Sequence, residues 1–159
     1  MSRAWLFPIV LAAMVATAVA ALGSTITVLG PWYHGLVQPR WAPPDYVYGM
    51  GWTAIYALTV LAAVSGWRMM QAGESDLLIT LYAINGFLNI TWSLLFFQLQ
   101  RPDWAVIEVI FLWLSVGSLI LYTWRRSIIG AVLLIPYLLW VTFAGYLTMT
   151  IVRLNGPFS

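Results

Sequence analysis

The sequence contains no cysteine and no lysine, and only 8% of its 159 residues are charged. Without cysteine the chain can form no disulfide bond, no thiolate metal site and no cysteine nucleophile. Without lysine it cannot hold retinal or pyridoxal phosphate as a Schiff base, because both need a lysine amine. Soluble domains are about 25% charged, so this chain has too few charges to cover a soluble globule. These absences indicate a membrane protein.

The few charges are also scattered, and familiar catalytic motifs are missing. Seven basic residues, all arginine, stand against five acids, and the only adjacent basic pair is Arg125 and Arg126. Nucleic-acid binding needs a basic surface, so we expect no nucleic-acid partner. There is no Walker loop, Gly-rich dinucleotide fingerprint, HExxH motif or Ser-His-Asp set. The single histidine, His34, cannot fill two haem positions or build a conventional zinc site, so we expect no metal centre. The alternatives for His34 are a single axial ligand or a proton donor, and we favour a solvated loop residue.

Apolar residues fill most of the chain. They make up 62% of the sequence, and the mean hydropathy is +0.89. A membrane-spanning helix takes about 20 apolar residues, so the chain accommodates five spans and no soluble domain. We predict an all-α membrane protein, with residues 1–159 as a single domain built from a bundle of five transmembrane helices. The predicted spans cover residues 4–29, 47–70, 77–100, 104–124 and 128–152.

The first apolar run has a second interpretation, a signal peptide with Arg3 as its charged n-region and residues 18–20 as a small-residue cleavage site. Because the run continues to residue 29, longer than usual for such a segment, we favour a span. Five spans place the two termini on opposite sides of the membrane. The distribution of arginines then weakly favours an inside N-terminus. Four arginines share the N-terminal side and three the other: Arg3, Arg68, Arg125 and Arg126 against Arg40, Arg101 and Arg153.

The connection between the first two spans, residues 30–46, is the longest and contains four prolines. Proline restricts its own backbone and that of the preceding residue, so this loop loses less entropy on ordering than a Ser/Gly linker. Its aromatic residues Trp32, Tyr33 and Trp41 supply apolar surface that a disordered linker lacks. We interpret the segment as an ordered lid over one mouth of the bundle. The alternative is an interfacial loop that its aromatic rings merely anchor.

Three predicted spans carry aromatic or amide residues along one helical face. Asparagine in hydrocarbon is costly unless it is paired, so the face of the third span must point inward. Each stripe alone is typical of helix packing, but together they predict a pocket that reaches from the loop to mid-membrane. The stripes are Trp52, Tyr56, Thr59 and Ala63; Asn85, Asn89, Trp92 and Phe96; and Tyr137, Trp140 and Ala144.

Two further patterns leave alternatives open. Glu108 is the only acid well inside an apolar run, which makes it a functional candidate; alternatively it reaches lipid headgroups or Arg101 at the nearby interface. The small residues Ala13, Thr17 and Ala21 recur at intervals of four, a spacing that allows close helix approach. It serves either packing within the bundle or a dimer contact.

The loop and the stripes together resemble a known family. Trp32-Tyr33, Leu36, Pro39, Trp41 and Pro43-Pro44 form the pattern WYxxLxxPxWxPP, which is similar to the signature of the TspO/MBR family of tryptophan-rich sensory proteins and translocator proteins. The asparagine stripe fits the third helix of that family, and residues 135–138 with Trp140 fit its fifth. The resemblance covers essentially the whole chain.

Family resemblance implies a five-helix bundle, usually a homodimer, in a bacterial or organelle membrane. It implies a pocket beneath the first loop that binds porphyrins such as haem or protoporphyrin IX, and other lipophilic small molecules, with no obligatory cofactor. We add that porphyrin propionates would meet Arg40 or His34 in the lid. The implied loop and pocket residues are Trp32, Tyr33, Trp41, Trp52, Asn89, Trp92, Tyr137, Trp140 and Ala144.

Three functions remain open at this stage. The first is a porphyrin sensor or scavenger, and the second is a light-dependent porphyrin-degrading activity in which Trp52 and Trp140 are the electron-rich partners. The third is a transporter, which the lack of paired broken segments disfavours. Cholesterol binding is doubtful, because Met149 stands where the tyrosine of the sterol motif would precede Arg153.

Overall fold

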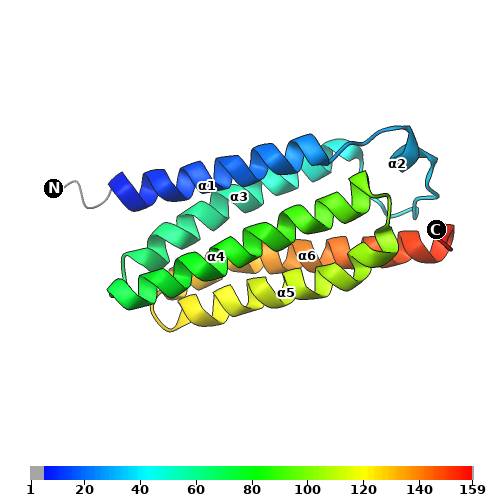
Figure 1. The fold of residues 1–159 in the computed structure, drawn as a ribbon. Coiled ribbons are helices and arrows are strands. Elements are labelled where there is room, and N and C mark those ends of the chain that lie inside the picture. The colour runs from blue at the N-terminus through cyan, green and yellow to red at the C-terminus, as the bar shows by residue number, and fades with distance from the viewer. Residues whose placement is uncertain (1–5, 159) are drawn as a thin grey trace.

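The computed structural model describes residues 6–158, and these form helices and connecting turns without any strand. The long helices run side by side, with the C-terminus and the short helix α2 at one end and the N-terminus at the other (Figure 1). This confirms the predicted all-α bundle. The elements are α1 (Leu6–Ile26), α2 (Pro31–Gly35), α3 (Asp45–Trp67), α4 (Ala72–Ser93), η1 (Leu94–Gln98), α5 (Pro102–Trp124) and α6 (Ile128–Asn155).

In the part of the chain that the structure describes, four helices are long and apolar enough to cross a membrane: α3, α4 continued through η1, α5 and α6. In α1 the apolar stretch Val10–Ile26 is shorter. The chain is therefore a multi-pass membrane protein. Arg3, on which the predicted orientation partly depends, lies outside the described residues.

Several helix boundaries differ from the predicted spans by two to five residues, and two of these differences concern helix starts next to the connecting loops. Helix α4 begins at Ala72 rather than at 77, because the Glu74 carboxylate accepts a hydrogen bond from the Gln71 backbone N–H at 3.1 Å and so caps the first turn. Hydropathy does not register this polar turn. The predicted loop 30–46 contains the helix α2 and ends where α3 begins at Asp45, one residue after a proline.

The end of α4 is a π-helix, η1. The Leu99 backbone N–H donates to the Leu94 carbonyl at 2.9 Å, five residues back instead of four. Such turns occur frequently at functional sites. Gln100 then adopts a left-handed φ of 53°, and the chain turns into α5.

Close packing of three helices shapes the end of the bundle opposite the lid. A Cβ atom added to Gly130 would lie 2.8 Å from the Thr123 methyl group and 3.1 Å from the Ala62 carbonyl oxygen. Only glycine therefore allows α6 to approach α3 and α5 this closely. The hydrophobic core that includes Ala62 also includes a buried row on α5, formed by Leu112, Val116 and Leu119.

Candidate functional site

A cavity of about 620 Å³ lies among α1, α3, α4 and α6, at the end of the bundle that carries the loop 30–46. We call it the lid chamber, and we call residues 30–46 the lid. Six of the nine residues that the sequence singled out line it: Tyr33, Trp52, Asn89, Trp92, Trp140 and Ala144. The other three, Trp32, Trp41 and Tyr137, lie outside its lining.

One wall of the lid chamber is an aromatic group on α3 and α6. The Trp52 and Trp140 rings meet edge to face, with centroids 6.2 Å apart, and Trp52 stacks on Tyr56 at 5.5 Å. A Cβ atom on Gly51 would lie 2.4 Å from the Trp140 ring. The ring of Trp140 can therefore rest against α3 only because residue 51 is glycine.

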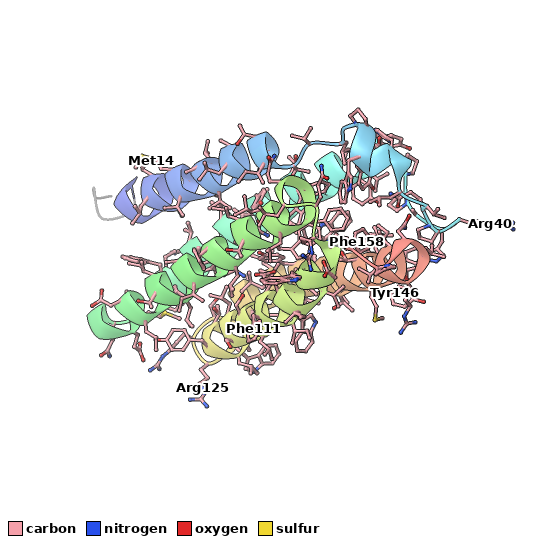
Figure 2. All side chains as sticks on the ribbon, turned by 45° about the vertical axis from the view of Figure 1, so that its right-hand side comes forward. Met14, Arg40, Phe111, Arg125, Tyr146 and Phe158 are labelled. Atoms are coloured by element: carbon pink, nitrogen blue, oxygen red, sulfur yellow. The ribbon has the colours of Figure 1, made fainter. Side chains whose placement is uncertain are left out.

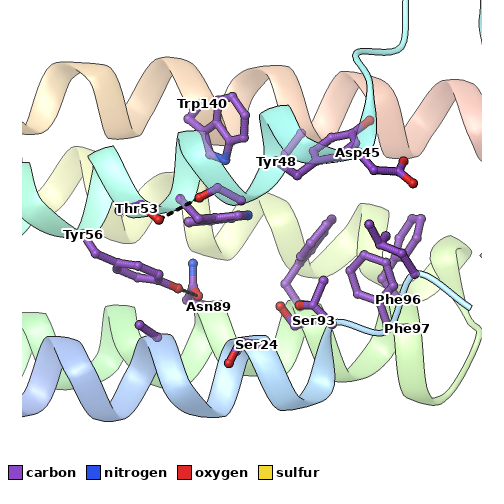
Figure 3. A pocket seen from close by; sticks show the side chains of 18 of the residues that line it. Ser24, Asp45, Tyr48, Thr53, Tyr56, Asn89, Ser93, Phe96, Phe97 and Trp140 are labelled. Carbon is purple, nitrogen blue, oxygen red and sulfur yellow. Dashed lines mark hydrogen bonds between the residues drawn. The ribbon is translucent and has the colours of Figure 1, made fainter.

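The facing wall comes from the end of α4 and from η1. Trp92 stacks on Phe96 with centroids 5.4 Å apart, and Phe96 contacts Phe97 at 4.7 Å. Figure 3 shows both phenylalanines beside Ser93, across the cavity from Trp140. The lid contributes Tyr33, whose ring lies 5.9 Å from that of Phe97. Trp32 packs against the edge of Phe96 at 5.9 Å without lining the chamber.

The floor of the lid chamber is a hydrogen-bonded row that we call the polar layer. The Tyr56 hydroxyl donates to Asn89 Oδ1 at 3.0 Å, and Asn89 Nδ2 donates to the Tyr137 hydroxyl at 3.2 Å. That hydroxyl donates to Asn85 Oδ1 at 3.1 Å, and Asn85 Nδ2 donates to Ser115 Oγ at 2.9 Å. The row joins α3, α4, α6 and α5, and it gives both amides the partners that hydrocarbon surroundings require. It also explains why Tyr137 lies below the chamber rather than in its lining.

The chamber walls, unlike the polar layer, contain polar atoms without hydrogen-bond partners within residues 6–158. The indole nitrogens of Trp92 and Trp140 have no hydrogen-bond partner among the described residues. A buried tryptophan N–H usually finds one. The two indoles therefore retain unused donors in residues that line the chamber.

The mouth of the lid chamber carries a small polar group. Asp45 lines the chamber, and its Oδ2 lies 3.6 Å from Nε2 of His34. Burial raises the pKa of the Tyr33 hydroxyl, and the nearby charge of Asp45 raises it further. Tyr33 is therefore neutral at physiological pH. Arg40 extends from the tip of the lid away from the bundle (Figure 2).

Two contacts hold the lid against α6. The Val37 backbone N–H donates to Asn155 Oδ1 at 2.7 Å, and Asn155 Nδ2 donates back to the Val37 carbonyl at 3.0 Å. Trp41 stacks on Tyr146 with ring centroids 5.2 Å apart and meets Phe143 edge to face at 6.1 Å. Trp41 thus fastens the lid from outside the chamber.

Glu108 does not reach the interface as one interpretation of the sequence had it. It is 7% exposed, and neither of its oxygens has a hydrogen-bond partner among residues 6–158. Arg101 is bound instead to both oxygens of Asp103, at 2.9 and 2.6 Å. Glu108 does not line the lid chamber either. Within residues 6–158 no group of three His, Cys, Asp or Glu residues is placed to hold a metal.

Sequence reasoning missed the wall that α1 contributes. Thr17, Ala21 and Ser24 line the chamber, whereas the spacing of the first two suggested only helix packing or a dimer contact. Small side chains leave space beside a helix, and hydropathy gives no sign of it. Ser24 also bonds its own helix, donating to the Ala21 carbonyl at 2.9 Å.

Known proteins are similar in sequence to this chain over most of its length. The model of the TspO/MBR family matches residues 4–154. The chain is 38% identical over 144 residues to the tryptophan-rich protein TspO of Chlorobaculum tepidum, covering 87% of this chain and 89% of that relative. It is 34% identical over 148 residues to the tryptophan-rich sensory protein of Cereibacter sphaeroides, covering 90% and 92%. It is 30% identical over 147 residues to the translocator protein of Sus scrofa, covering 87% of each. The chain therefore belongs to the TspO/MBR family.

Proposed function

We propose that the lid chamber binds a porphyrin and that the protein acts as a membrane sensor or scavenger of such molecules. The observation that carries this proposal is a cavity of about 620 Å³ with two aromatic walls. Binding pockets for small molecules usually have volumes of about 300–1,000 Å³. Aromatic rings attract one another in offset or edge-to-face arrangements, so a flat, apolar macrocycle matches these walls.

The polar groups near the chamber favour a particular form of the ligand. Among the described residues that line the chamber there is no histidine, cysteine or methionine, so a haem iron would lack the commonest axial ligands. Metal-free protoporphyrin IX therefore suits the chamber better than haem. At the mouth, the propionates would meet His34 beside Asp45 rather than Arg40, which is directed away from the bundle.

Tryptophan variants test this assignment. We expect Trp52→Phe and Trp140→Phe to weaken protoporphyrin IX binding while leaving the fold intact, because an aromatic ring remains at each position. Trp104→Phe and Trp124→Phe are the matched controls, since both residues are more than half exposed and line no part of the chamber. The measurement is a titration in detergent, followed by porphyrin absorbance and tryptophan fluorescence. Equal affinities for the chamber variants and the controls would contradict the proposal.

A second function, light-dependent degradation of the bound porphyrin, is favoured by one observation. Trp52 and Trp140 lie in ring contact in the chamber wall, where two electron-rich indoles would face a bound macrocycle. Repeating the titration under illumination in air, against a dark control, separates the two functions. A new product spectrum that Trp140→Phe abolishes supports degradation, whereas unchanged porphyrin absorbance supports binding alone.

A further inference from the structure

A second cavity lies on the far side of the polar layer, and we propose that it holds an acyl chain of a bilayer phospholipid. This lower cavity has a volume of about 200 Å³ and lies among α1, α3 and α4, with Tyr137 of α6 at its edge. Tyr56 and Asn89 line both cavities. Since these two residues are hydrogen-bonded to each other, they separate the lower cavity from the lid chamber.

The wall of the lower cavity suits hydrocarbon rather than a polar ligand. Most of it is aliphatic, with Leu11, Val15, Val19, Val60, Leu78 and Ile79 among its residues. Its amides and most of its hydroxyls are already engaged. Tyr56, Asn85, Asn89 and Tyr137 bond within the polar layer, and Thr59 Oγ1 donates to the Ile55 carbonyl at 2.7 Å. A ligand that needs hydrogen bonds would therefore find few free partners here.

The size of the lower cavity agrees with this chemistry. An apolar cavity of about 150 Å³ remains dry and accepts benzene. A cavity of about 200 Å³ therefore has room for a short length of acyl chain, and its apolar lining disfavours water.

The rim of the lower cavity faces the bilayer. Val15 on α1 and Ile79 on α4 both line it and are 48% and 41% exposed, respectively. Nearer the lid the two helices come together, since a Cβ on Gly86 would lie 3.4 Å from the Val19 side chain. The entrance is thus lateral, between α1 and α4, and the molecules present there are lipid chains. The cavity residues 78–86 of α4 lie about 6–18 Å along the helix from Glu74, at a rise of about 1.5 Å per residue. This depth corresponds to the middle of a lipid acyl chain.

Photolabelling in vesicles tests the proposal directly. The protein is placed in phosphatidylcholine vesicles that contain a phospholipid with a diazirine midway along one acyl chain, and the labelled residues are mapped by mass spectrometry after irradiation. We expect label on the inward-facing residues of α1 and α4 around the lower cavity. Ala16 lines this cavity, so Ala16→Phe should fill it and reduce that label severalfold. Label confined to the outer faces of the helices in the wild type would overturn the proposal.

Matched variants keep the result interpretable. Met14 is 61% exposed and points away from the bundle (Figure 2), so Met14→Phe should leave the labelling of the cavity unchanged. If Ala16→Phe does not fold, Ala63→Leu fills the cavity from α3 instead. Inward label that survives a folded filling variant would also overturn the proposal.

Two further arms distinguish an acyl chain from other occupants. Tyr82 lines the lower cavity, and its buried hydroxyl has no hydrogen-bond partner among the described residues. Tyr82→Phe should not change the labelling, because a hydrocarbon chain does not need the hydroxyl; a loss of label would assign the cavity to a polar ligand instead. An excess of protoporphyrin IX should not compete with the lipid either. Competition would place the label in the lid chamber and refute a separate site.

Discussion

The polar layer and the walls of the lid chamber lie on neighbouring turns of the same helices, yet they use their polar atoms in opposite ways. In the layer, both ends of the Asn85 and Asn89 amides are bonded to other helices. In the walls, Trp92 and Trp140 keep indole donors without a partner. Asn89 and Trp92 are less than one turn apart on α4. The difference separates side chains that hold the bundle together from side chains that are free to meet a ligand.

The largest effect should come from breaking the polar layer. Asn89→Leu leaves the Tyr56 hydroxyl without its acceptor and the Tyr137 hydroxyl without its donor, and hydrogen bonds between membrane helices are worth about 0.6–2 kcal/mol. We expect the free energy of unfolding to fall by about 1–3 kcal/mol. Thermal unfolding in detergent measures this, with Thr80→Val as control, because Thr80 is exposed on α4 and bonds only to its own helix.

The comparison also predicts how this loss depends on ligand. Asn89 lines the chamber but is committed to its neighbours, so the fall in Tm should be similar with and without saturating protoporphyrin IX. A loss confined to the ligand-induced rise in Tm would show that Asn89 belongs with the chamber walls.

The next largest effect should come from displacing the Trp140 ring in the chamber wall. Gly51→Ala places a Cβ atom where the Trp140 ring now lies, and overpacking of this kind costs about 1–3 kcal/mol. Alanine gains back about 0.5–1 kcal/mol of helix propensity, so the net loss of stability should stay below about 2.5 kcal/mol while porphyrin affinity falls about tenfold. Gly117→Ala is the control, because apart from its chain neighbours and its own helix backbone no described atom lies within 4 Å of its added Cβ. Unchanged affinity in Gly51→Ala would remove Trp140 from the binding surface.

A smaller effect should follow from detaching the lid. Asn155→Leu removes the two hydrogen bonds to Val37, each worth about 1 kcal/mol. Because Trp41 still packs on α6, we expect porphyrin release to accelerate by no more than about tenfold. Stopped-flow fluorescence measures this rate, with Thr150→Val as control, since Thr150 is only partly buried and its hydroxyl donates within α6 to the Tyr146 carbonyl. An unaltered release rate would mean that the lid does not limit ligand exit.

The smallest effect should come from loosening the lid backbone. Replacing Pro43 and Pro44 with glycine increases the entropy that the free loop loses on ordering, by about 0.4–1 kcal/mol per residue. We expect release to accelerate about two- to fivefold without a change in the stability of the bundle. If release does not change, the proline-rich segment serves only as an anchor at the membrane surface.

Periodicity predicted the buried faces well, because burial of a stripe depends only on residue spacing. Asn85, Asn89, Trp92 and Phe96 are all less than 10% exposed. Spacing could not show that the two asparagines belong to the polar layer and the two aromatic residues to the chamber wall. That difference depends on hydroxyl groups contributed by other helices. For the same reason spacing grouped Tyr137 with the pocket, although its hydroxyl lies between two amides of α4.

Other features were hidden because hydropathy does not register them. The start of α4 depends on the Glu74 carboxylate, and the α1 wall depends on small side chains such as Thr17. The pairing of Asn155 with Val37 joins residues 118 positions apart. A single sequence contains no signal for that contact.

The π-helix η1 is a position where a relative could lose one residue and thereby change the shape of the site. Its turn holds one residue more than an α-turn, so a relative with one residue fewer between 94 and 98 would keep α4 intact up to Ser93. Residues beyond the deletion would keep their places, because Leu99 would then stand four residues after Leu94 and the turn would close as an ordinary α-turn. Phe96 and Phe97 could not both remain in the chamber wall. A one-residue gap at this point in an alignment of homologues would therefore mark a change in the shape of the pocket.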